Sequence, residues 1–298
     1  MRLRPVLLLT LLLVSGATQQ AAAAPVPDDA AERRALGREL RERDLPARAS
    51  GRLVAAAEWG AFAVRRTGPG TSRIGGRGVL PAGETWPVRR GRPLDFVAIV
   101  DLAEVPRFPQ RELLPADGTL LFFAALESLW EPTDSGNHAG SALRVWYVPP
   151  GTTLRQATRP RATRRAPSDS APASVPRFPL AWRPRLTLTD SWTARYDRRY
   201  RLTRSQSRRY ERVTTRWADR WDVPRYGRDD GRSANAILGI PQTAQDDPRG
   251  VGQVAVLTVV PWTFGGEFLD GGDVAFVIGR DDLAARRWDR VDAVPSSS

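Results

Sequence analysis

Carboxylates grouped near the C-terminus are the residues best suited to chemistry in this sequence. They are Asp246 and Asp247, then Glu267, Asp270 and Asp273, then Asp281 and Asp282. Two carboxylates at a suitable separation can act as the acid and base of a glycosidase, or can hold a hard cation such as calcium. The alternative interpretation is structural, because Asp and Gly are also the residues that turns require. The "DGGD" spacing does not match an EF-hand, so we predict no metal site.

Other catalytic arrangements find little support in the sequence. The single histidine, His138, lies in the turn-like stretch "SGNHAGS", and no Gly-x-Ser-x-Gly elbow occurs. The absence of cysteine excludes disulfides, thiolate metal sites and cysteine nucleophiles. The glycine-rich stretch "GPGTSRIGGRG" lacks the spacing of a dinucleotide fingerprint, and there is no P-loop, so we predict no cofactor.

The loop "ILGIPQTAQDDPRG" offers polar side chains that suit binding as well as catalysis. Gly-x-Pro opens this loop and Pro-Arg-Gly closes it. The candidate binding residues are Gln245, Asp246, Asp247, Arg249, Asp270, Asp273 and Trp86.

The first residues have the layout of a secretory signal peptide. Arg2 and Arg4 precede an apolar run from Val6 to Val14, which is too short to span a bilayer, and small residues follow. The small residues predict cleavage near Ala23, so that the signal peptide covers residues 1–23. We therefore expect a secreted or envelope-associated protein with no transmembrane segment after signal removal. A wrongly assigned start codon or an apolar tail is the alternative.

The positive charge is concentrated in the middle of the chain. The net charge is +12, all basic residues are arginines, and residues 151–232 hold 21 Arg against 8 Asp plus Glu. Such a field favours acidic partners. Outside the cytoplasm these would be anionic envelope polymers or lipid head groups rather than nucleic acid. A solvated basic segment that binds nothing specific is the alternative.

Two stretches of the chain follow a common plan, which predicts an internal repeat. In the first, about residues 70–150, Gly75-Gly76 precede "LDFVAIVDL", and a turn then leads to "LLFF". In the second, about residues 233–292, Gly239-Ile240-Pro241 precede "GQVAVLTVVPW", and a turn leads to "VAFV". Both read as a strand-turn-strand unit rich in Val, Ile and Leu. The repeat favours a structural role for the glycine loops.

The segments around the two stretches are expected to be helical or irregular. Residues 24–48 predict a short charged helix and linker, capped by Asp28 or Asp29, and "RLVAAAEWGAFAVRRTG" predicts a strand region. The Pro/Arg-rich residues 158–179 predict a disordered insertion. We expect residues 49–298 to form a single domain.

An Arg/aromatic helix, or a broken pair of helices, is predicted at about residues 190–222, between the two copies. Side chains that are mostly aromatic recur there at spacings of three or four, with arginines on the opposite face. This face can pack against a sheet, which we favour, or stack on a polymer or sugar.

Several of these motifs resemble the YwqG-like proteins, a bacterial family of unassigned function. The resemblance rests on "LPAGETWP", "PLDFVAIVDLAEVP", "ILGIPQTAQDDPR" and "DGGDVAFVIGRDDL", within residues 53–291. It implies an α+β fold with two related sheet units and no established reaction. This chain departs from the family pattern at Ile99 and Thr258, where the family has Gln, and at Val260, where it has Asp.

Two functions remain open at this point. The first is an exported, non-enzymatic binding protein for an acidic envelope polymer or a protein partner, using the loop from Gln245 to Arg249 and the Arg/aromatic helix. The second is a carboxylate-dependent hydrolase or cation-dependent enzyme that uses the Asp residues within 245–273. A separation above about 10 Å between the carboxylates would make paired acid/base chemistry implausible.

Overall fold

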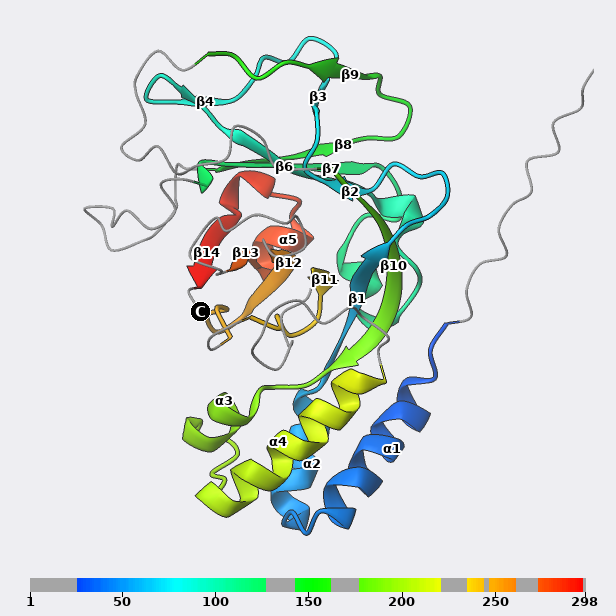
Figure 1. Cartoon of the computed structure of the whole chain (residues 1–298), viewed down its shortest axis with the longest axis vertical. Helices are drawn as coiled ribbons and strands as arrows, with labels where there is room; N and C mark the ends of the chain where they lie inside the picture. The colour runs from blue at the N-terminus through cyan, green and yellow to red at the C-terminus, as the bar shows by residue number, and fades with distance from the viewer. Residues whose placement is uncertain are drawn as a thin grey trace, which may run out of the picture.

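A large, strongly curved antiparallel sheet runs through the molecule, with helices packed at one end (Figure 1). The computed structural model describes residues 26–126, 143–161, 177–220, 235–243, 247–260 and 273–296. Within these residues the fold is mixed α+β and rich in strands, as the sequence predicts in outline.

The main sheet has ten strands in the described part of the chain, and each pairs antiparallel with its neighbour. In sheet order, the strands are β14 (Asp292–Ser296), β13 (Asp273–Gly279), β12 (Gln253–Val259), β11 (Ala236–Leu238), β1 (Glu58–Arg65), β10 (Phe178–Thr187), β2 (Arg73–Ile74), β6 (Asp95–Asp101), β7 (Thr119–Ala124) and β8 (Leu143–Val148).

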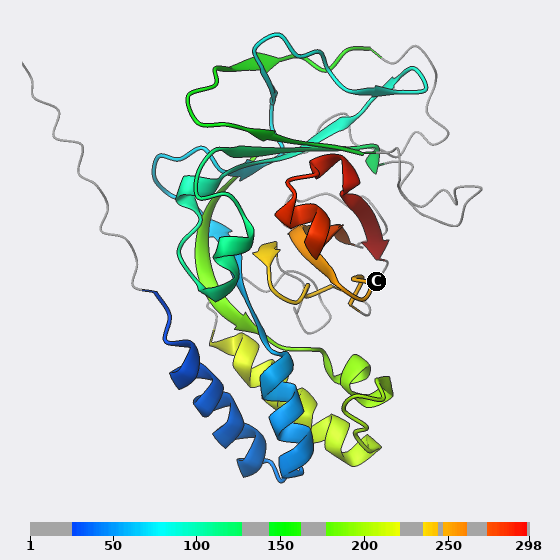
Figure 2. The same ribbon diagram turned by 180° about the vertical axis from the view of Figure 1, so that it is seen from behind.

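The sheet curves so far that strands from its two ends meet across the core. Phe122 of β7 contacts Phe276 of β13 edge to face, with 5.1 Å between ring centroids. Tyr147 of β8 stacks on Trp288, which lies just before β14, at 6.3 Å. Figure 2 shows the same closure from behind, with the β12 to β14 region facing the β6 to β8 layer. The apolar strand faces are therefore buried against each other.

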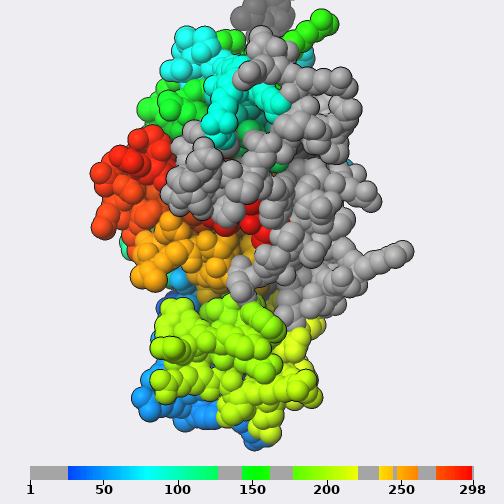
Figure 3. Space-filling model, turned by 90° about the vertical axis from the view of Figure 1, so that its left-hand side faces the viewer, coloured from blue at the N-terminus to red at the C-terminus, as the bar shows by residue number. Residues whose placement is uncertain are grey.

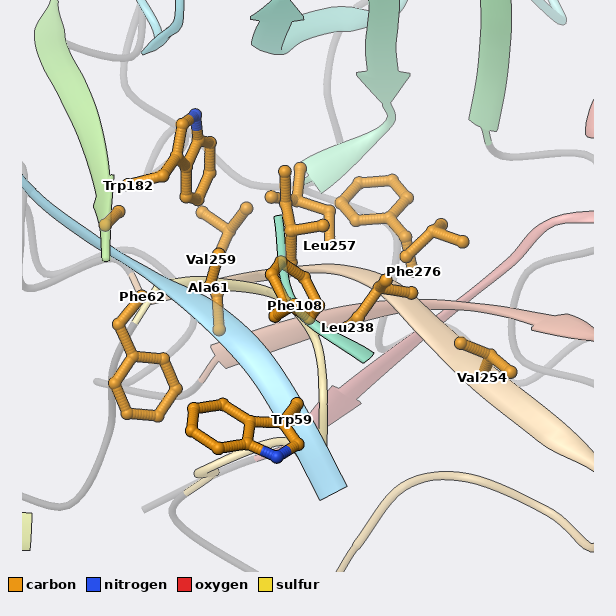
Figure 4. Close-up of a cluster of buried hydrophobic side chains, with 14 of the residues drawn as sticks. Trp59, Ala61, Phe62, Phe108, Trp182, Leu238, Val254, Leu257, Val259 and Phe276 are labelled. Carbon is orange, nitrogen blue, oxygen red and sulfur yellow. The ribbon is translucent and has the colours of Figure 1, made fainter. Parts of the chain in front are cut away.

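The main core fills the inside of this curve. Figure 4 shows its centre, where Trp59 and Phe62 of β1 lie with Leu257 of β12 and Phe276 of β13. A second, smaller core lies on the other face of β6 and β7, beneath the two-stranded sheet of β3 (Gly78–Pro81) and β9 (Leu154–Ala157). Because both faces of β6 are covered, that strand is apolar at successive positions rather than at alternate ones.

Four helices gather at the lower end of the molecule in Figure 1. They are α1 (Asp29–Glu42), α2 (Ala47–Ala56), α3 (Ser191–Tyr196) and α4 (Arg204–Asp219). Arg220, after α4, binds the buried Glu39 of α1 at 2.8 Å, which ties the two helices together. The remaining short elements are α5 (Arg280–Ala284), the 3-10 helices η1 (Leu102–Glu104), η2 (Pro109–Leu113) and η6 (Trp288–Arg290), and the hairpin of β4 (Val88–Arg89) with β5 (Arg92–Pro93).

The helix boundaries confirm some expectations and correct one. Asp28 caps α1, since its Oδ1 accepts a hydrogen bond from the Ala31 N–H at 2.9 Å. The strand region expected from Arg52 onward is wrong at its start, because α2 continues to Ala56 and β1 begins only at Glu58. Residues 52–56 are mostly Ala, Leu and Arg, which favour helix, and they pack on α1.

The structure shows matching irregularities in two strand pairs. The β6–β7 pair shifts register between Phe96 and Ala98, and the β12–β13 pair shifts between Ala255 and Leu257. Two successive residues with positive φ lie at the end of the short strand before each pair. They are Gly75-Gly76, directly after β2, and Leu238-Gly239, the last residue of β11 and the next one. In the described part of the chain, no helix is long and apolar enough to cross a membrane.

Candidate functional site

Arg249 is the centre of a buried ionic cluster near the start of β12. Its side chain is 9% exposed and binds two carboxylates, Asp247 and Glu58, each at 2.7 Å. Its Nε also donates to Asp247, at 2.9 and 3.1 Å to the two oxygens, so this pair is bidentate. Glu58 comes from the start of β1, so the cluster joins two distant parts of the sequence.

The backbone around Gly239 positions this cluster. Arg249 Nη1 donates to the Gly239 carbonyl at 3.2 Å. The Thr187 hydroxyl accepts from the Ile240 N–H at 2.8 Å and donates to the Glu58 carbonyl at 2.6 Å, which links β10, β11 and β1. Gly239 has φ of 73°, and a Cβ there would lie 2.9 Å from the Thr187 hydroxyl. The glycine is therefore required by both the conformation and the close approach.

The carboxylates around Arg249 keep its guanidinium charged despite its burial. Burial lowers the pKa of Arg249, but the hydrogen bonds and charge of Asp247, together with the charge of Glu58, outweigh burial and raise the pKa above its ordinary value. Asp247 and Glu58 both accept hydrogen bonds from this permanent cation. The cluster therefore places carboxylate oxygens, which are hydrogen-bond acceptors, beside the cavity.

A cavity of about 450 Å³ opens over this cluster, between β1, β11 and helix α3. Glu58, Asp247 and Arg249 form one wall. Trp192 and Tyr196 form another, with ring centroids 4.4 Å apart, and their side chains are 58% and 56% exposed. In Figure 3 the α3–α4 segment lies directly below the segment that leads into β12. The cavity therefore combines charged acceptors with an exposed aromatic surface.

Helix α4 is tied to β10, to the segment after it and to the start of α3 by one side-chain hydrogen bond each. Ser207 donates to the Ser191 carbonyl at 2.9 Å, Tyr210 to the Thr189 carbonyl at 2.8 Å, and Trp217 to the Leu186 carbonyl at 2.9 Å. All three donors are buried residues of α4. The aromatic face predicted for residues 190–222 thus divides: the α4 part packs on the sheet, and the α3 part is exposed.

A second, larger cavity of about 980 Å³ adjoins the first, between α2 and the α3–α4 connection. The two cavities share Ala56, Arg199 and Tyr200. The larger one is rich in arginine and has no carboxylate among its lining residues, and its arginines are Arg48, Arg52, Arg198, Arg199 and Arg201. Its electrostatic character is thus opposite to that of the Asp247–Glu58 wall.

Several contacts order the arginines of this larger cavity. Arg52 Nη1 donates to the Arg199 carbonyl at 2.6 Å. Arg199 binds Asp197 at 2.6 Å, and its hydrogen bond to Asp197 is the main cause that lowers the pKa of that carboxyl. Arg48 and Arg198 make no ion pair with any described residue and are exposed. These two guanidinium groups are the natural contacts for an anion.

The structure brings together only some of the predicted site residues. Asp247 and Arg249 meet in the cluster described above. Asp273 lies at the other end of β12, since Val274 pairs with Val259, the last residue of that strand. The strand spans about 20 Å at 3.3 Å per residue. Asp273 is buried and accepts a hydrogen bond from Ser296 of β14. The two Asp residues do not share a cavity.

The remaining candidates lie elsewhere or outside the described residues. Trp86 is buried in the second core, where its Nε1 donates to the Leu94 carbonyl at 2.9 Å. Gln245, Asp246 and Asp270 lie outside the described residues, as do Glu267 and His138. In the part of the chain that is described, no group of three or more His, Asp and Glu side chains is arranged to hold a metal ion.

Sequence reasoning missed the residues that the N-terminal segment contributes. Glu58, Arg48 and Arg52 carry no motif, and they reach the site only because β1 and α2 lie beside β11 and α3. The one signal in the sequence was the Trp192–Tyr196 spacing, which indicated a shared helix face but not its exposure.

A comparison with known families gives a match over most of the chain. The profile of a family described as "Domain of unknown function (DUF1963)" matches residues 72–294. The chain belongs to this family. The DUF1963 match includes α3, α4 and Arg249, whereas Glu58, Arg48 and Arg52 precede it, so both cavities combine residues from inside and outside the matched range. A comparison with curated proteins found no match.

Proposed function

We propose that this protein is a non-enzymatic binding protein for an anionic polymer of the cell envelope. One observation carries the proposal. The cavity of about 980 Å³ beside α2 is lined by arginines and by no carboxylate. Guanidinium groups bind carboxylates and phosphates with two parallel hydrogen bonds, which suits recognition of a repeated anionic group.

The charge of the surrounding segment supports this assignment. The net charge of +12 is concentrated between residues 151 and 232, which include α3, α4 and their connection. Arg48 and Arg198 have no ion-pair partner among the described residues, so an incoming anion need not displace an existing carboxylate there. A positive cavity of this kind also raises the local concentration of anions.

The alternative, a carboxylate-dependent enzyme, has weaker support in the geometry. Its four Asp residues include Asp247 and Asp273, which lie at opposite ends of β12. Glu58 is the carboxylate that does lie beside Asp247, but both bind Arg249. A carboxylate held by a guanidinium acts as a hydrogen-bond acceptor, whereas a glycosidase needs one of its two carboxyl groups as a proton donor.

A binding assay with chemically defined polyanions tests the proposal. The purified protein is titrated with fluorescently labelled polygalacturonate and with polyphosphate, at low and at moderate salt. We expect binding of at least one polyanion that weakens as salt rises. In the double variant Arg48→Ala/Arg198→Ala, the affinity should fall about tenfold, because two charge-assisted contacts are lost.

A charge-matched variant provides the control. Arg65 and Arg107 are exposed and line neither of the two cavities. Arg65→Ala/Arg107→Ala removes the same charge from another surface and should change the affinity less than about twofold. Absence of binding to every polyanion, or equal losses in both double variants, would overturn the proposal.

We further propose that the sheet is built from two duplicated units, β2 with β6 to β8 and β11 with β12 to β14. Matching register shifts in β6–β7 and β12–β13 support this, as do the paired positive φ values beside β2 and β11. The strand order supports it as well, because β10 borders one unit and β1 the other. Helices α3 and α4 would then lie in sequence between the copies.

Export belongs to the same proposal. The layout of residues 1–23, with two arginines, an apolar run and small residues, supports a cleaved signal peptide. N-terminal sequencing of the protein recovered from outside the cytoplasm tests this, with a new N-terminus near Ala24 as the expected result. Recovery of the intact chain from the cytoplasm alone would contradict export.

A further inference from the structure

We propose that the ligand is an acidic polysaccharide that occupies both adjoining cavities. Its sugar ring lies against Trp192 and Tyr196 with its hydroxyls toward Glu58 and Asp247, and its carboxylate lies among the arginines beside α2. This inference rests on the proposed function, because it requires the arginine-lined cavity to bind an anion. It adds the chemical class of the ligand and a second contact surface.

The exposure of the two aromatic side chains is the first argument. The exposed large hydrophobic residues among those described are Val26, Val88, Trp192, Tyr196 and Val251. The aromatic members, Trp192 and Tyr196, lie side by side on α3 and line the same cavity. Arg195 lies over the Tyr196 ring at 5.0 Å, which helps to hold that ring in place. An exposed aromatic pair suits stacking against the apolar face of a sugar ring.

The carboxylates that line the same cavity are the second argument. Asp247 and Glu58 are 22% and 26% exposed. Asp247 already accepts four hydrogen bonds from Arg249, whereas the Glu58 carboxylate accepts one from it and has acceptor capacity left. Sugar hydroxyls are the donors that would use this capacity.

The junction between the cavities is the third argument. They share Ala56, Arg199 and Tyr200, so one extended ligand can enter both. On one side of Arg199 lie the carboxylates Glu58, Asp247 and Asp197, and on the other lie arginines without any carboxylate. A ligand that fits must therefore be rich in hydroxyls at one point and anionic at the next.

This charge pattern discriminates among polyanions. Polyphosphate would place an anion beside Asp247 and Glu58, where like charges repel. A neutral glucan would satisfy the carboxylate wall and leave the arginines without an anion. A polymer of uronic acids presents both hydroxyls and a carboxylate on each ring, and so matches the two walls together.

The test compares three probes of similar chain length, polygalacturonate, polyphosphate and neutral dextran. We expect polygalacturonate to bind more tightly than polyphosphate, and dextran to bind weakly or not at all. Trp192→Ala should weaken polygalacturonate binding about tenfold and change polyphosphate binding less than twofold, because stacking is lost without any change in charge. Trp192→Phe, which keeps an aromatic ring, should restore much of the affinity.

Val88→Ala is the control for Trp192→Ala, because Val88 is similarly exposed, at 55% against 58%, but lies outside both cavities. Circular dichroism of each variant confirms that the fold is retained.

The outcomes separate this inference from the proposed function. Equal affinities for polygalacturonate and polyphosphate, with no effect of Trp192→Ala, would overturn the sugar site and leave the anion-binding function standing. Failure of both polyanions to bind would overturn the two together. Dextran binding as tight as that of polygalacturonate would show a sugar site that ignores charge, which would also contradict both.

Discussion

At the scale of single residues, Tyr210 shows how one buried hydroxyl positions the site. Its side chain is 1% exposed, and it donates to the Thr189 carbonyl in the segment that leads into α3. Burial, followed by the neighbouring charges of Tyr200 and Asp190, raises the pKa of Tyr210 well above the ordinary value of tyrosine. The native state therefore keeps this proton at a pH where the unfolded chain loses it.

The pH dependence of stability follows from that difference. Tyr210 ionises near pH 10 in the unfolded chain and only at higher pH in the native protein. Its contribution is fully present below pH 10 and is lost as pH rises toward the native pKa. Above pH 10 it should lower the free energy of unfolding by about 1.4 kcal/mol per pH unit. Urea denaturation at pH 8 and pH 11 measures this slope.

Tyr210→Phe separates the hydroxyl from the ring. At pH 8 the variant should be less stable by about 1 kcal/mol, because the hydrogen bond to Thr189 is lost. At pH 11 the gap should close or reverse, since Phe does not ionise. Tyr196→Phe, at an exposed tyrosine, should keep the wild-type slope. An unchanged gap between pH 8 and pH 11 would contradict the assignment of the alkaline loss to Tyr210.

At the scale of elements, the pairing of β1 with β11 determines whether the Arg249 cluster forms. Gly60 of β1 lies opposite Leu238 of β11, and a Cβ at Gly60 would lie 2.5 Å from the Leu238 carbonyl oxygen. Leu238 has a positive φ and is followed by Gly239, whose carbonyl binds Arg249. Backbone on both sides of the contact is therefore fixed, and it has little freedom to move away from an added methyl group.

Gly60→Ala should accordingly destabilise the protein by about 1–3 kcal/mol, the usual cost of forcing extra volume into packed structure. Gly51→Ala is the matched control, and its expected effect on the free energy of unfolding has the opposite sign. Gly51 lies within α2, and a Cβ there would meet no atom within 4 Å. Removing a flexible glycine from a helix should stabilise the protein by about 0.5–1 kcal/mol. Equal urea midpoints for the two variants would contradict the close contact between β1 and β11.

The strands that sequence reasoning located are those whose signal is local. The runs at β6, β7, β12 and β13 are apolar at successive positions, and Asp28 caps α1 as its chemistry suggests. The pairing of β1 with β10 joins Glu58 to Thr187 and has no counterpart in local pattern. Such non-local pairing brings Glu58 to Arg249, which is why the loop residues were predicted and their partner was not.

The helical spacing of the aromatic residues also could not predict which of them are exposed. Trp192, Tyr210 and Trp217 share the spacing of one helix face. The helical conformation is interrupted between α3 and α4. Tyr210 and Trp217 therefore face the sheet, while Trp192 faces the cavity. Periodicity specifies a shared face, but the packing of the whole fold decides which members of that face remain in contact with water.

At the scale of the whole molecule, positive cavities lie on both sides of α2. The cavity beside α3 and α4 contacts one face of α2, through Ala49 and Arg52 among others. Another cavity of about 460 Å³ lies between α1 and the opposite face of α2 and contains four arginines, which are Arg33, Arg34, Arg38 and Arg41. Figure 2 shows α2 between α1 and the α3 region. A polymer long enough to cross α2 can therefore reach both positive cavities.

Affinity should then depend on the length of the ligand. A short oligogalacturonate can occupy only the two adjoining cavities on the α3–α4 side of α2. A longer chain can also contact the α1 cavity, and this second contact is intramolecular, so it raises the affinity of the whole chain. Arg38→Ala/Arg41→Ala should weaken binding of long chains about tenfold and leave short oligomers within about twofold. Added salt should weaken both, and long chains more steeply, because more ionic contacts are screened. Titration of a length series at two salt concentrations measures these effects. Equal affinities across the series, together with no effect of the α1 variant, would restrict the anion-binding surface to the α2–α4 side of the molecule.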